Sequence, residues 1–293
     1  MEYPHVPVLL QETIDGLDLR AGDSVVDCTA GAGGHSEAIL EKTSPDGRLL
    51  ALDLDEAALD TARRRLSRFG SRAMLVRANY TDVRRVLQSE SFGPVQAALL
   101  DLGFSSMEID DPARGFSFRA DGPLDMRYDA SQDVSAATIV NGWGEDEIAD
   151  IIHEYGEERY ARQIAAAIVR RRRAVRIIGT LDLADVIASA VPASYRHSVP
   201  HFATRTFQAL RIAVNDEIRN LEAVLPELTA ALAPGGRLAV ISFHSLEDRI
   251  VKRFFLDTPE LEPKTKRPVE AGEEELARNS RARSAKLRIA VKR

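Results

Sequence analysis

Three acidic residues stand at the ends of short apolar runs and are the best placed side chains for chemistry. Asp27 follows Val25 and Val26, Asp53 closes the run 48–53, and Asp101 follows the run 95–100. If these runs are parallel strands, their carboxyl ends lie along the sheet edge where ligands bind in doubly wound folds. The three residues are therefore candidates for holding a ligand or assisting a reaction.

A glycine-rich bend follows the first of these acids. The segment 27–35 reads DCTAGAGGH and places Gly33, Gly34 and His35 between a strand and a helix. Glycine provides backbone angles that other residues resist and room for a ligand to approach the chain. Asp53 comes 22 residues after Gly31, where an acid can accept both hydroxyl hydrogens of an adenosine ribose. The two features predict a nucleoside-containing cofactor.

The residues around the bend favour S-adenosylmethionine as that cofactor. The third position of a dinucleotide fingerprint is Ser36 rather than glycine, and a pyrophosphate favours a bare helix N-terminus. No Gly-Lys-Ser/Thr follows the glycines, which excludes a P-loop. Asp27, just before the bend, suits the ammonium of the methionine moiety. A nicotinamide enzyme and a purely structural glycine turn remain as alternatives.

Asp101 and two further residues, Tyr80 and His244, follow the other predicted strands. Asp101 could hold the cofactor or accept a hydrogen bond from an attacking amine, and the alternative is a helix-capping acid. Tyr80 could stack on adenine or be an ordinary buried tyrosine. His244, after the fifth predicted strand, could contact substrate or be a simple loop histidine.

The elements that must position these residues alternate between strands and helices, which predicts a parallel sheet covered on both faces. We expect strands at 24–28, 48–53, 73–77, 95–100 and 237–242, with helices between the first four, at about 34–42, 56–69 and 82–89. The residues 233–236 should form a turn before the fifth strand. The segment 286–291 alternates like a half-buried strand.

The interval between the fourth and fifth strands is far longer than one crossover helix requires. Helical patterns near 146–151, 160–173 and 181–190 indicate an inserted helical domain. We expect a methyltransferase domain at 1–109 and 214–293 and an inserted substrate-recognition domain at 110–213. A long helix at 205–221 should lead back to the sheet, and Ser245 with Asp248 resembles a capping box for a helix through Phe255.

Composition places the chain among soluble cytoplasmic proteins. A single cysteine cannot form an intrachain disulfide, the first residues do not resemble a signal peptide, and no apolar stretch approaches the ~18 residues of a membrane span. The six histidines show no metal-ligand spacing, so we expect neither a membrane nor a metal partner. The oligomeric state stays open, with a homodimer among the options.

Positive charge is concentrated locally although the net charge is −6. The residues 276–293 hold seven Lys or Arg and no acid, and a predicted helix face carries Arg205, Gln208, Arg211 and Asn215. A second basic run consists of Arg170, Arg171, Arg172 and Arg173. Each run could be ordinary solvated surface, but together they indicate a polyanionic partner.

The chain resembles the bacterial 16S ribosomal RNA cytosine-N4 methyltransferase family over nearly its whole length. The resemblance rests on ordered motifs, since the glycine segment alone is common. The motifs are HVPVLLQE at 5–12, DCTAGAGGH at 27–35, LDLGFSS at 100–106, RGFSF at 114–118, GPLDMR at 122–127, YGEER at 155–159, ATRTFQALR at 203–211, SFHSLEDR at 242–249 and RARS at 281–284.

The resemblance implies a Rossmann-like S-adenosylmethionine methyltransferase sheet with an inserted helical domain. It also implies N4-methylation of a cytosine in the P-site of the decoding centre, with 16S RNA or the 30S subunit as partner. The cofactor contacts that carry over are Gly33, Gly34, His35, Asp53, Tyr80 and Asp101. The family usually has Gln at position 108, where this chain has Glu108. The resemblance implies a cofactor contact at this position, which we therefore expect for Glu108.

The chemistry that follows is attack of cytosine N4 on the sulfonium methyl group, with Asp101 as the candidate catalytic residue. The base must leave any duplex to reach the site. For RNA contact we expect the run 170–173, Arg205 and Arg211 on their helix face, His244, and the tail 278–293. Two rivals remain: a methyltransferase for small molecules or proteins, and an RNA-binding assembly factor with a relic cofactor pocket.

Overall fold

A computed structural model describes residues 7–103, 109, 111–197 and 201–293. The chain divides into two compact units, one of Met1–Gly103 and Ile218–Arg293 and one of Phe104–Glu217. The division therefore begins six residues before the expected inserted domain and ends four residues after it. We call them the sheet unit and the helical unit.

The sheet unit contains a mixed sheet in the order β3-β2-β1-β4-β5-β7-β6. β1 to β5 are parallel, whereas β7 runs antiparallel to both β5 and β6. The strands are β1 (Ser24–Asp27), β2 (Arg48–Asp53), β3 (Ala73–Arg77), β4 (Val95–Asp101), β5 (Leu232–Ser242), β6 (Leu261–Pro263) and β7 (Lys286–Lys292). The predicted α/β Rossmann-like class is confirmed.

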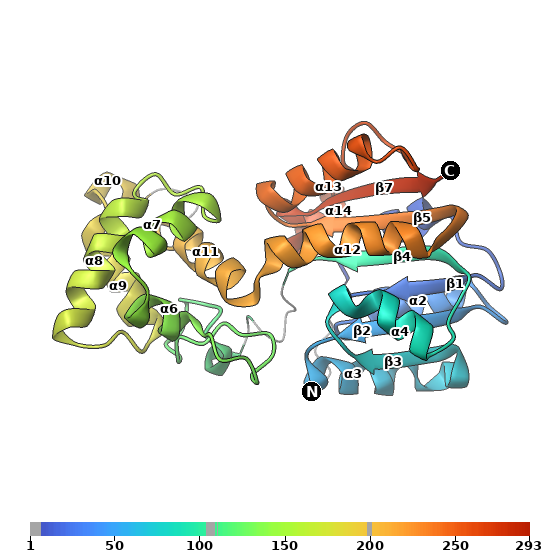
Figure 1. The fold of residues 1–293 in the computed structure, drawn as a ribbon, viewed down its shortest axis with the longest axis horizontal. Coiled ribbons are helices and arrows are strands. Elements are labelled where there is room, and N and C mark those ends of the chain that lie inside the picture. Colours follow the sequence, from blue (N-terminus) through green and yellow to red (C-terminus); the bar gives the residue numbers. More distant parts are fainter. Residues whose placement is uncertain (1–6, 104–108, 110, 198–200) are drawn as a thin grey trace. The chain divides into compact units, whose positions relative to one another are not determined.

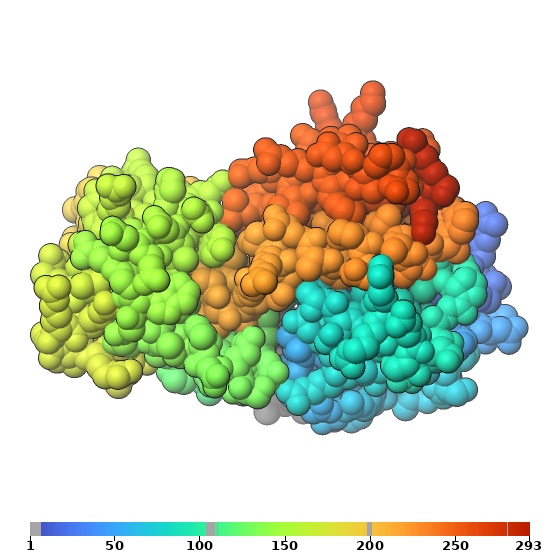
Figure 2. Space-filling model, viewed as in Figure 1, coloured from blue at the N-terminus to red at the C-terminus, as the bar shows by residue number. Residues whose placement is uncertain are grey.

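Helices cover both faces of this sheet (Figure 1). They are α1 (Leu10–Leu17), α2 (Gly34–Lys42), α3 (Glu56–Leu66), α4 (Val83–Ser89), α12 (Glu217–Ala231), α13 (Ser245–Asp257) and α14 (Glu273–Arg278), with short 3-10 turns at Ser67–Arg72, Tyr80–Asp82 and Ser280–Ser284. Side chains of α4, α12 and α13 form one core with one face of the sheet, and those of α1, α2 and α3 form a second core with the other face. Figure 2 shows α4 in teal and α12 in orange closing over the first of these faces.

The strands alternate their side chains between these two cores because successive residues of a strand point to opposite faces. Val26 and Leu50 lie in the core under α4 and α12, whereas Val25 and Leu49 lie in the core under α1 and α2. Both faces are apolar, which explains the continuous apolar runs in the sequence. None of the helices in the described residues is long and apolar enough to cross a membrane.

The helical unit has its own hydrophobic core, formed by Ile139, Ile164, Ile168 and their neighbours. Its helices are α6 (Ala136–Gly142), α7 (Glu145–Glu154), α8 (Ala161–Ala174), α9 (Thr180–Ala190), α10 (Ala193–Arg196) and α11 (Thr204–Asn215), with a 3-10 turn at Pro112–Arg114. The sequence predicted α7, α8 and α9 to within a few residues and missed α6 and α10.

The long helix predicted at 205–221 is wrong, because the structure contains two helices there. α11 ends at Asn215, and Asp216 adopts a left-handed conformation with φ of 51° before α12 begins at Glu217. The apolar side chains of this stretch are also divided between two hydrophobic cores. Phe207 and Leu210 belong to the core of the helical unit, and Leu221 belongs to a core of the sheet unit. The turn predicted at 233–236 is an irregularity within β5, where the register against β4 shifts.

Candidate active site

The carboxyl ends of three neighbouring strands form the candidate site. β1 lies between β2 and β4, and this is where the chain reverses the direction in which it adds strands. Asp27 pairs in register with Ala51 on β2 and Leu99 on β4. Asp53 and Asp101, the last residues of those strands, therefore extend two positions beyond Asp27. Ligands bind at such a switch point in open α/β sheets.

The glycine bend after β1 leaves its backbone accessible. Gly31 has φ of 50° and Gly33 has φ of 80°, angles that favour glycine. A Cβ at Gly31 would have no atom within 4 Å, whereas one at Gly34 would lie 2.3 Å from Pro7 Cγ. Gly31 thus offers open space to a ligand, and Gly34 permits close packing against the chain at Pro7.

Asp27 holds the bend in place. It accepts hydrogen bonds from Ser36 Oγ at 2.6 Å and from the Thr29 backbone amide at 3.1 Å. Burial raises the pKa of Asp27 to about 6, and the nearby Asp53 charge acts in the same direction. A cation close to this carboxylate would favour its ionised form.

Asp53, at the end of β2, is hydrogen-bonded to the glycine bend. Its carboxylate accepts from the backbone amide of Gly31 at 2.8 Å and from that of Asp55 at 2.9 Å. Burial raises the pKa of Asp53. Each carboxylate oxygen has two lone pairs, so both oxygens can also accept a ribose hydroxyl.

Asp101 is the least satisfied acid of the site. Its backbone amide donates to Thr29 Oγ1 at 2.7 Å, and its Oδ2 lies 3.5 Å from His35 Nδ1. Its Oδ1 is buried and has no hydrogen-bond partner among the described residues. Burial, followed by the charges of Asp27 and Glu247, raises the pKa of Asp101 well above its usual value. A buried, unpartnered acceptor of this kind is costly, and it marks a place where a donor or a cation would be stabilised.

His35 sits beside Asp101 in the first turn of α2. Its Nε2 lies 3.0 Å from the Val8 carbonyl oxygen, which can only accept, so Nε2 carries the proton of that hydrogen bond. The ring is buried. The structure thus makes His35 a bridge between the segment before α1 and Asp101.

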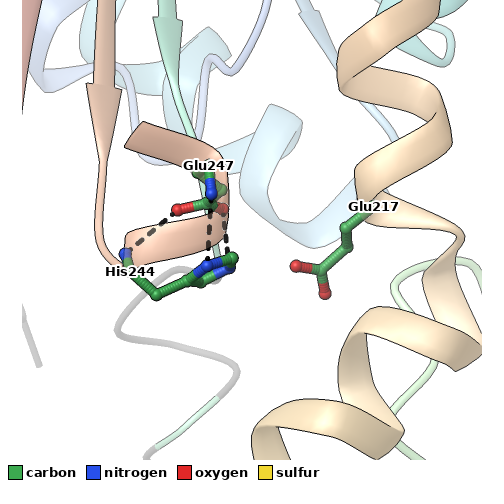
Figure 3. A group of neighbouring side chains, drawn as sticks. All are labelled: Glu217, His244 and Glu247. Carbon is green, nitrogen blue, oxygen red and sulfur yellow. Dashed lines mark hydrogen bonds and ion pairs between the residues drawn. The ribbon is translucent and has the colours of Figure 1, made fainter. Parts of the chain in front are cut away.

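Glu247, at the start of α13 just after the β5 loop, was not predicted from the sequence as a site residue. Figure 3 shows His244 and Glu247 in contact at the start of α13. Glu247 accepts from the Phe243 amide at 2.8 Å and the His244 amide at 3.3 Å, and His244 Nε2 lies 3.2 Å from its Oε1. The capping box predicted at Ser245 and Asp248 is wrong by one residue, because His244 is the N-cap and Glu247 occupies the third helical position.

Tyr80 begins the 3-10 turn Tyr80–Asp82, where the Asn79 side chain accepts from the Thr81 amide at 3.0 Å. The ring packs partly buried against the core under α4 and α12. Its contact with adenine stays a prediction. Glu108 lies outside the described residues.

Some of the predicted RNA-contacting residues are buried and hydrogen-bonded within the protein, and others are exposed. Arg211 is buried and donates two hydrogen bonds to Glu217, at 2.9 and 2.8 Å. This burial argues against a phosphate contact, since the guanidinium already has an anionic partner. Asn215 is likewise buried and donates to the Met126 carbonyl. The predicted helix face is therefore partly internal.

The basic run of α8 contains both arginines with partners inside the protein and exposed arginines. Arg171 pairs with Asp182 at 3.0 Å, and Arg172 donates to the Val140 carbonyl at 2.9 Å. Arg170 and Arg173 are exposed. Much of the predicted tail is strand β7, where Arg288 is buried against Asp248 at 2.6 Å.

Within each unit taken alone, the described residues include no group of three metal-ligating side chains close enough to share an ion. The expectation that no metal takes part stays a prediction.

The fold is of the Rossmann-like class, and its acidic sheet edge is suited to a nucleoside-containing cofactor. The family model described as the MraW methylase family matches residues 2–293. The chain therefore belongs to the MraW methylase family.

Three relatives named ribosomal RNA small subunit methyltransferase H are each 48% identical to the chain. The protein of Symbiobacterium thermophilum aligns over 100% of this chain and 98% of its own length. That of Carboxydothermus hydrogenoformans aligns over 100% and 99%, and that of Desulfotalea psychrophila over 99% of both.

Proposed function

We propose that this chain transfers the methyl group of S-adenosylmethionine to a cytosine of small-subunit ribosomal RNA. The acceptor we propose is N4 of a cytosine in the P-site of the decoding centre of 16S RNA. The observation that carries the proposal is the buried acidic edge formed by Asp27, Asp53 and Asp101, with one Asp101 oxygen unpartnered. The names of the full-length relatives support the substrate.

The residues at this edge fit S-adenosylmethionine by charge and by shape. Its ammonium and sulfonium are positive, and the acids whose pKa values are raised by burial and mutual repulsion are stabilised by a positive neighbour. Asp53 would accept from the ribose hydroxyls, Tyr80 would flank the adenine, and the backbone from Gly33 to His35 would line the methionine end. We keep Glu108 as a proposed cofactor contact.

When bound, S-adenosylmethionine supplies an electrophilic methyl group, which becomes bonded to N4 as the carbon–sulfur bond breaks and S-adenosylhomocysteine is released. The cytosine amine is a poor nucleophile because its lone pair is delocalised into the ring. Asp101 Oδ1 would accept a hydrogen bond from the amine and favour a pyramidal nitrogen. The departing amine proton leaves through this acceptor. Holding amine and methyl carbon in line should supply much of the rate.

The test is transfer of labelled methyl groups. Purified protein is incubated with labelled S-adenosylmethionine and, separately, with 16S RNA, 30S subunits and a cell extract depleted of both. We expect label in small-subunit RNA, with nucleotide mass mapping locating it on one N4-methylated cytosine. Label only in protein or small molecules would contradict the substrate, and no label anywhere would favour an RNA-binding factor with a relic pocket.

A further inference from the structure

Arg159 and Arg205 are among the arginines of the helical unit that have no acidic partner within the described residues. Arg159 is exposed and Arg205 is half-buried, and neither forms an ion pair with any described residue. Some arginines of this unit are neutralised, such as Arg127 by Asp125 at 2.7 Å and Arg211 by Glu217 at 2.8 Å. Arg159 and Arg205 therefore keep their full positive charge available.

Aromatic rings hold Arg159. Its guanidinium carbon lies 4.7 Å from the centre of the Tyr160 ring and 4.8 Å from that of Tyr195. The two rings meet edge to face, with centres 4.9 Å apart. A guanidinium at this distance over a ring face is attracted by the negative face of the ring. These contacts restrict the side chain without cancelling its charge or using its N–H donors.

A buried carboxylate holds the Tyr195 ring and the backbone of Tyr160. Glu158 is fully buried and accepts from the Tyr195 hydroxyl at 2.6 Å and from the Tyr160 backbone amide at 2.9 Å. Burial, then Glu158, raises the pKa of Tyr195 to about 12, so this hydroxyl remains a donor at neutral pH. Glu158 is thus engaged by the tyrosines rather than by Arg159.

Arg205 is brought to the same place by close backbone packing. Its Nη1 donates to the Glu157 carbonyl oxygen at 2.8 Å. A Cβ at Gly156 would lie 2.6 Å from the Arg205 carbonyl oxygen and 2.6 Å from that of Ile152. Only glycine allows the segment before α8 to touch the first turn of α11 so closely. The charges of both arginines also act on Tyr195, whose pKa each of them lowers against the dominant effect of burial.

The local backbone adds to this positive charge. Neither α8 nor α11 has an acidic residue in its first turn or a side-chain cap at its N-terminus. Arg205 lies within the first turn of α11, and Arg159 directly precedes the N-cap of α8. A cation at the positive end of a helix is unfavourable, and a bound anion would relieve that repulsion.

The rings around the arginines favour a nucleic acid over an acidic peptide. Besides Tyr160 and Tyr195, the exposed His201 ring stacks on Phe118 at 4.7 Å, just before α11. The partial burial of this ring against its neighbours lowers the pKa of His201, which favours the neutral ring. Alternating arginines and aromatic rings are typical of surfaces that follow a single strand, with guanidinium groups on phosphates and rings against bases.

We infer that Arg159 and Arg205 together bind the phosphodiester backbone of the RNA substrate, as a site separate from the basic run at 170–173. This inference rests on the proposed function for the class of ligand. Arg159 contributes two-pronged hydrogen bonding to phosphate oxygens, oriented by the tyrosines, and Arg205 contributes the donors that Glu157 does not use.

The test is the binding of a fluorescein-labelled single-stranded RNA oligonucleotide to the full-length protein at several salt concentrations. Each of Arg159→Gln and Arg205→Gln should weaken binding about 3–10-fold and reduce the slope of log affinity against log salt by about 0.7, the value for one single-strand phosphate contact. Arg159→Lys keeps the charge but loses the planar fork, so the slope should persist while affinity falls. Arg85→Gln, at a 71% exposed position of the sheet unit, is the matched charge control and should change neither quantity.

Methyl transfer to 16S RNA by the wild-type protein is measured in parallel. If the wild type methylates RNA while Arg159→Gln/Arg205→Gln binds the oligonucleotide with unchanged affinity and slope, the inference is overturned and the proposed function stands. If the variant keeps RNA binding but loses binding to polyglutamate, the site serves an acidic protein and the inference is also wrong. If the wild type neither binds nor methylates RNA, the proposed function fails and the inference fails with it.

Discussion

Asp101 combines a buried acceptor with two neighbouring negative charges, and this is the arrangement that a methyl transfer from a sulfonium to an amine can use. Its Oδ1 has no partner among the described residues, and the Asp27 and Glu247 charges raise its pKa. In the unliganded protein these features cost stability. The proposed function explains why an acid occupies this position.

Asp101→Asn should separate this role from folding. The amide has nearly the same shape and removes a buried charge, so thermal stability should stay equal or rise. Loss of the charged acceptor should lower kcat for methyl transfer about 100- to 1000-fold, the range found for one electrostatic contact in a transition state. The measurement is single-turnover transfer of labelled methyl groups, with calorimetry of cofactor binding as control. Unchanged kcat would remove Asp101 from the chemistry.

Asp27 should make stability depend on pH. Its folded pKa of about 6 lies above the ordinary value of 3.8, so the folded state binds the proton more tightly than the unfolded state. The contribution of Asp27 therefore becomes less favourable as pH rises through this window, by about 2 kcal/mol between about pH 4 and about pH 8.

The measurement for Asp27 is urea unfolding of wild type and Asp27→Asn across that range. The free energy of unfolding of the wild type should fall relative to the variant as pH rises. Parallel pH profiles for the two proteins would contradict the raised pKa.

At this scale the sequence predicted where the acids and glycines lie, at strand ends and in the bend before α2, because a strand end followed by glycines has few structural alternatives. It could not predict that Arg211 is buried against Glu217, since a basic residue on a helix face looks the same whether its partner is solvent or a distant carboxylate. Glu247 was missed for a different reason. Its signal was an acid three residues after His244, and histidine is an unusual N-cap.

Among the elements, the junction of α11 and α12 shows how local pattern and tertiary structure diverge. The apolar spacing of 205–221 fits one continuous helix, but Asp216 takes a left-handed conformation and Arg211 reaches across the break to Glu217. Aspartate tolerates this conformation better than most residues, which is a weak sequence signal. β7 was recognised as a strand, but its antiparallel pairing with β5 depends on contacts distant in sequence.

Arg211→Ala should therefore destabilise the protein rather than simply weaken RNA binding. It leaves Glu217 buried without its cation, a change that costs about 3–5 kcal/mol. The exposed Arg173→Ala is the control and should shift the free energy of unfolding by less than about 0.5 kcal/mol. Equal stabilities of the two variants in urea would show that the pair at the junction contributes little.

For the whole molecule, the main feature is two units with separate hydrophobic cores and different chemistry. The sheet unit carries the acidic edge, and the helical unit carries Arg159 and Arg205. A net charge of −6 disfavours general attraction to RNA, so binding must depend on local positive sites. The alternation of strands and helices predicted the sheet unit closely. The helical unit was predicted less completely because its short helices, such as α10, carry little periodic signal.

Cofactor binding should slow amide exchange at the acidic edge of the sheet unit. Amide hydrogen exchange measured by mass spectrometry with and without S-adenosylmethionine should show slower exchange in peptides covering 27–36 and 53–55. Peptides covering 161–190 should be unchanged, because none of the proposed cofactor contacts lies in that segment. Protection confined to the helical unit would place the cofactor elsewhere.

The most direct test of the account is a calorimetric titration of the purified, folded protein with S-adenosylmethionine and with S-adenosylhomocysteine. Both compounds should bind in a one-to-one ratio. Both carry the ammonium assigned to Asp27, so both should gain affinity as pH rises past about 6, when Asp27 ionises. Absence of binding by either compound would contradict the assignment of the acidic sheet edge as a cofactor site.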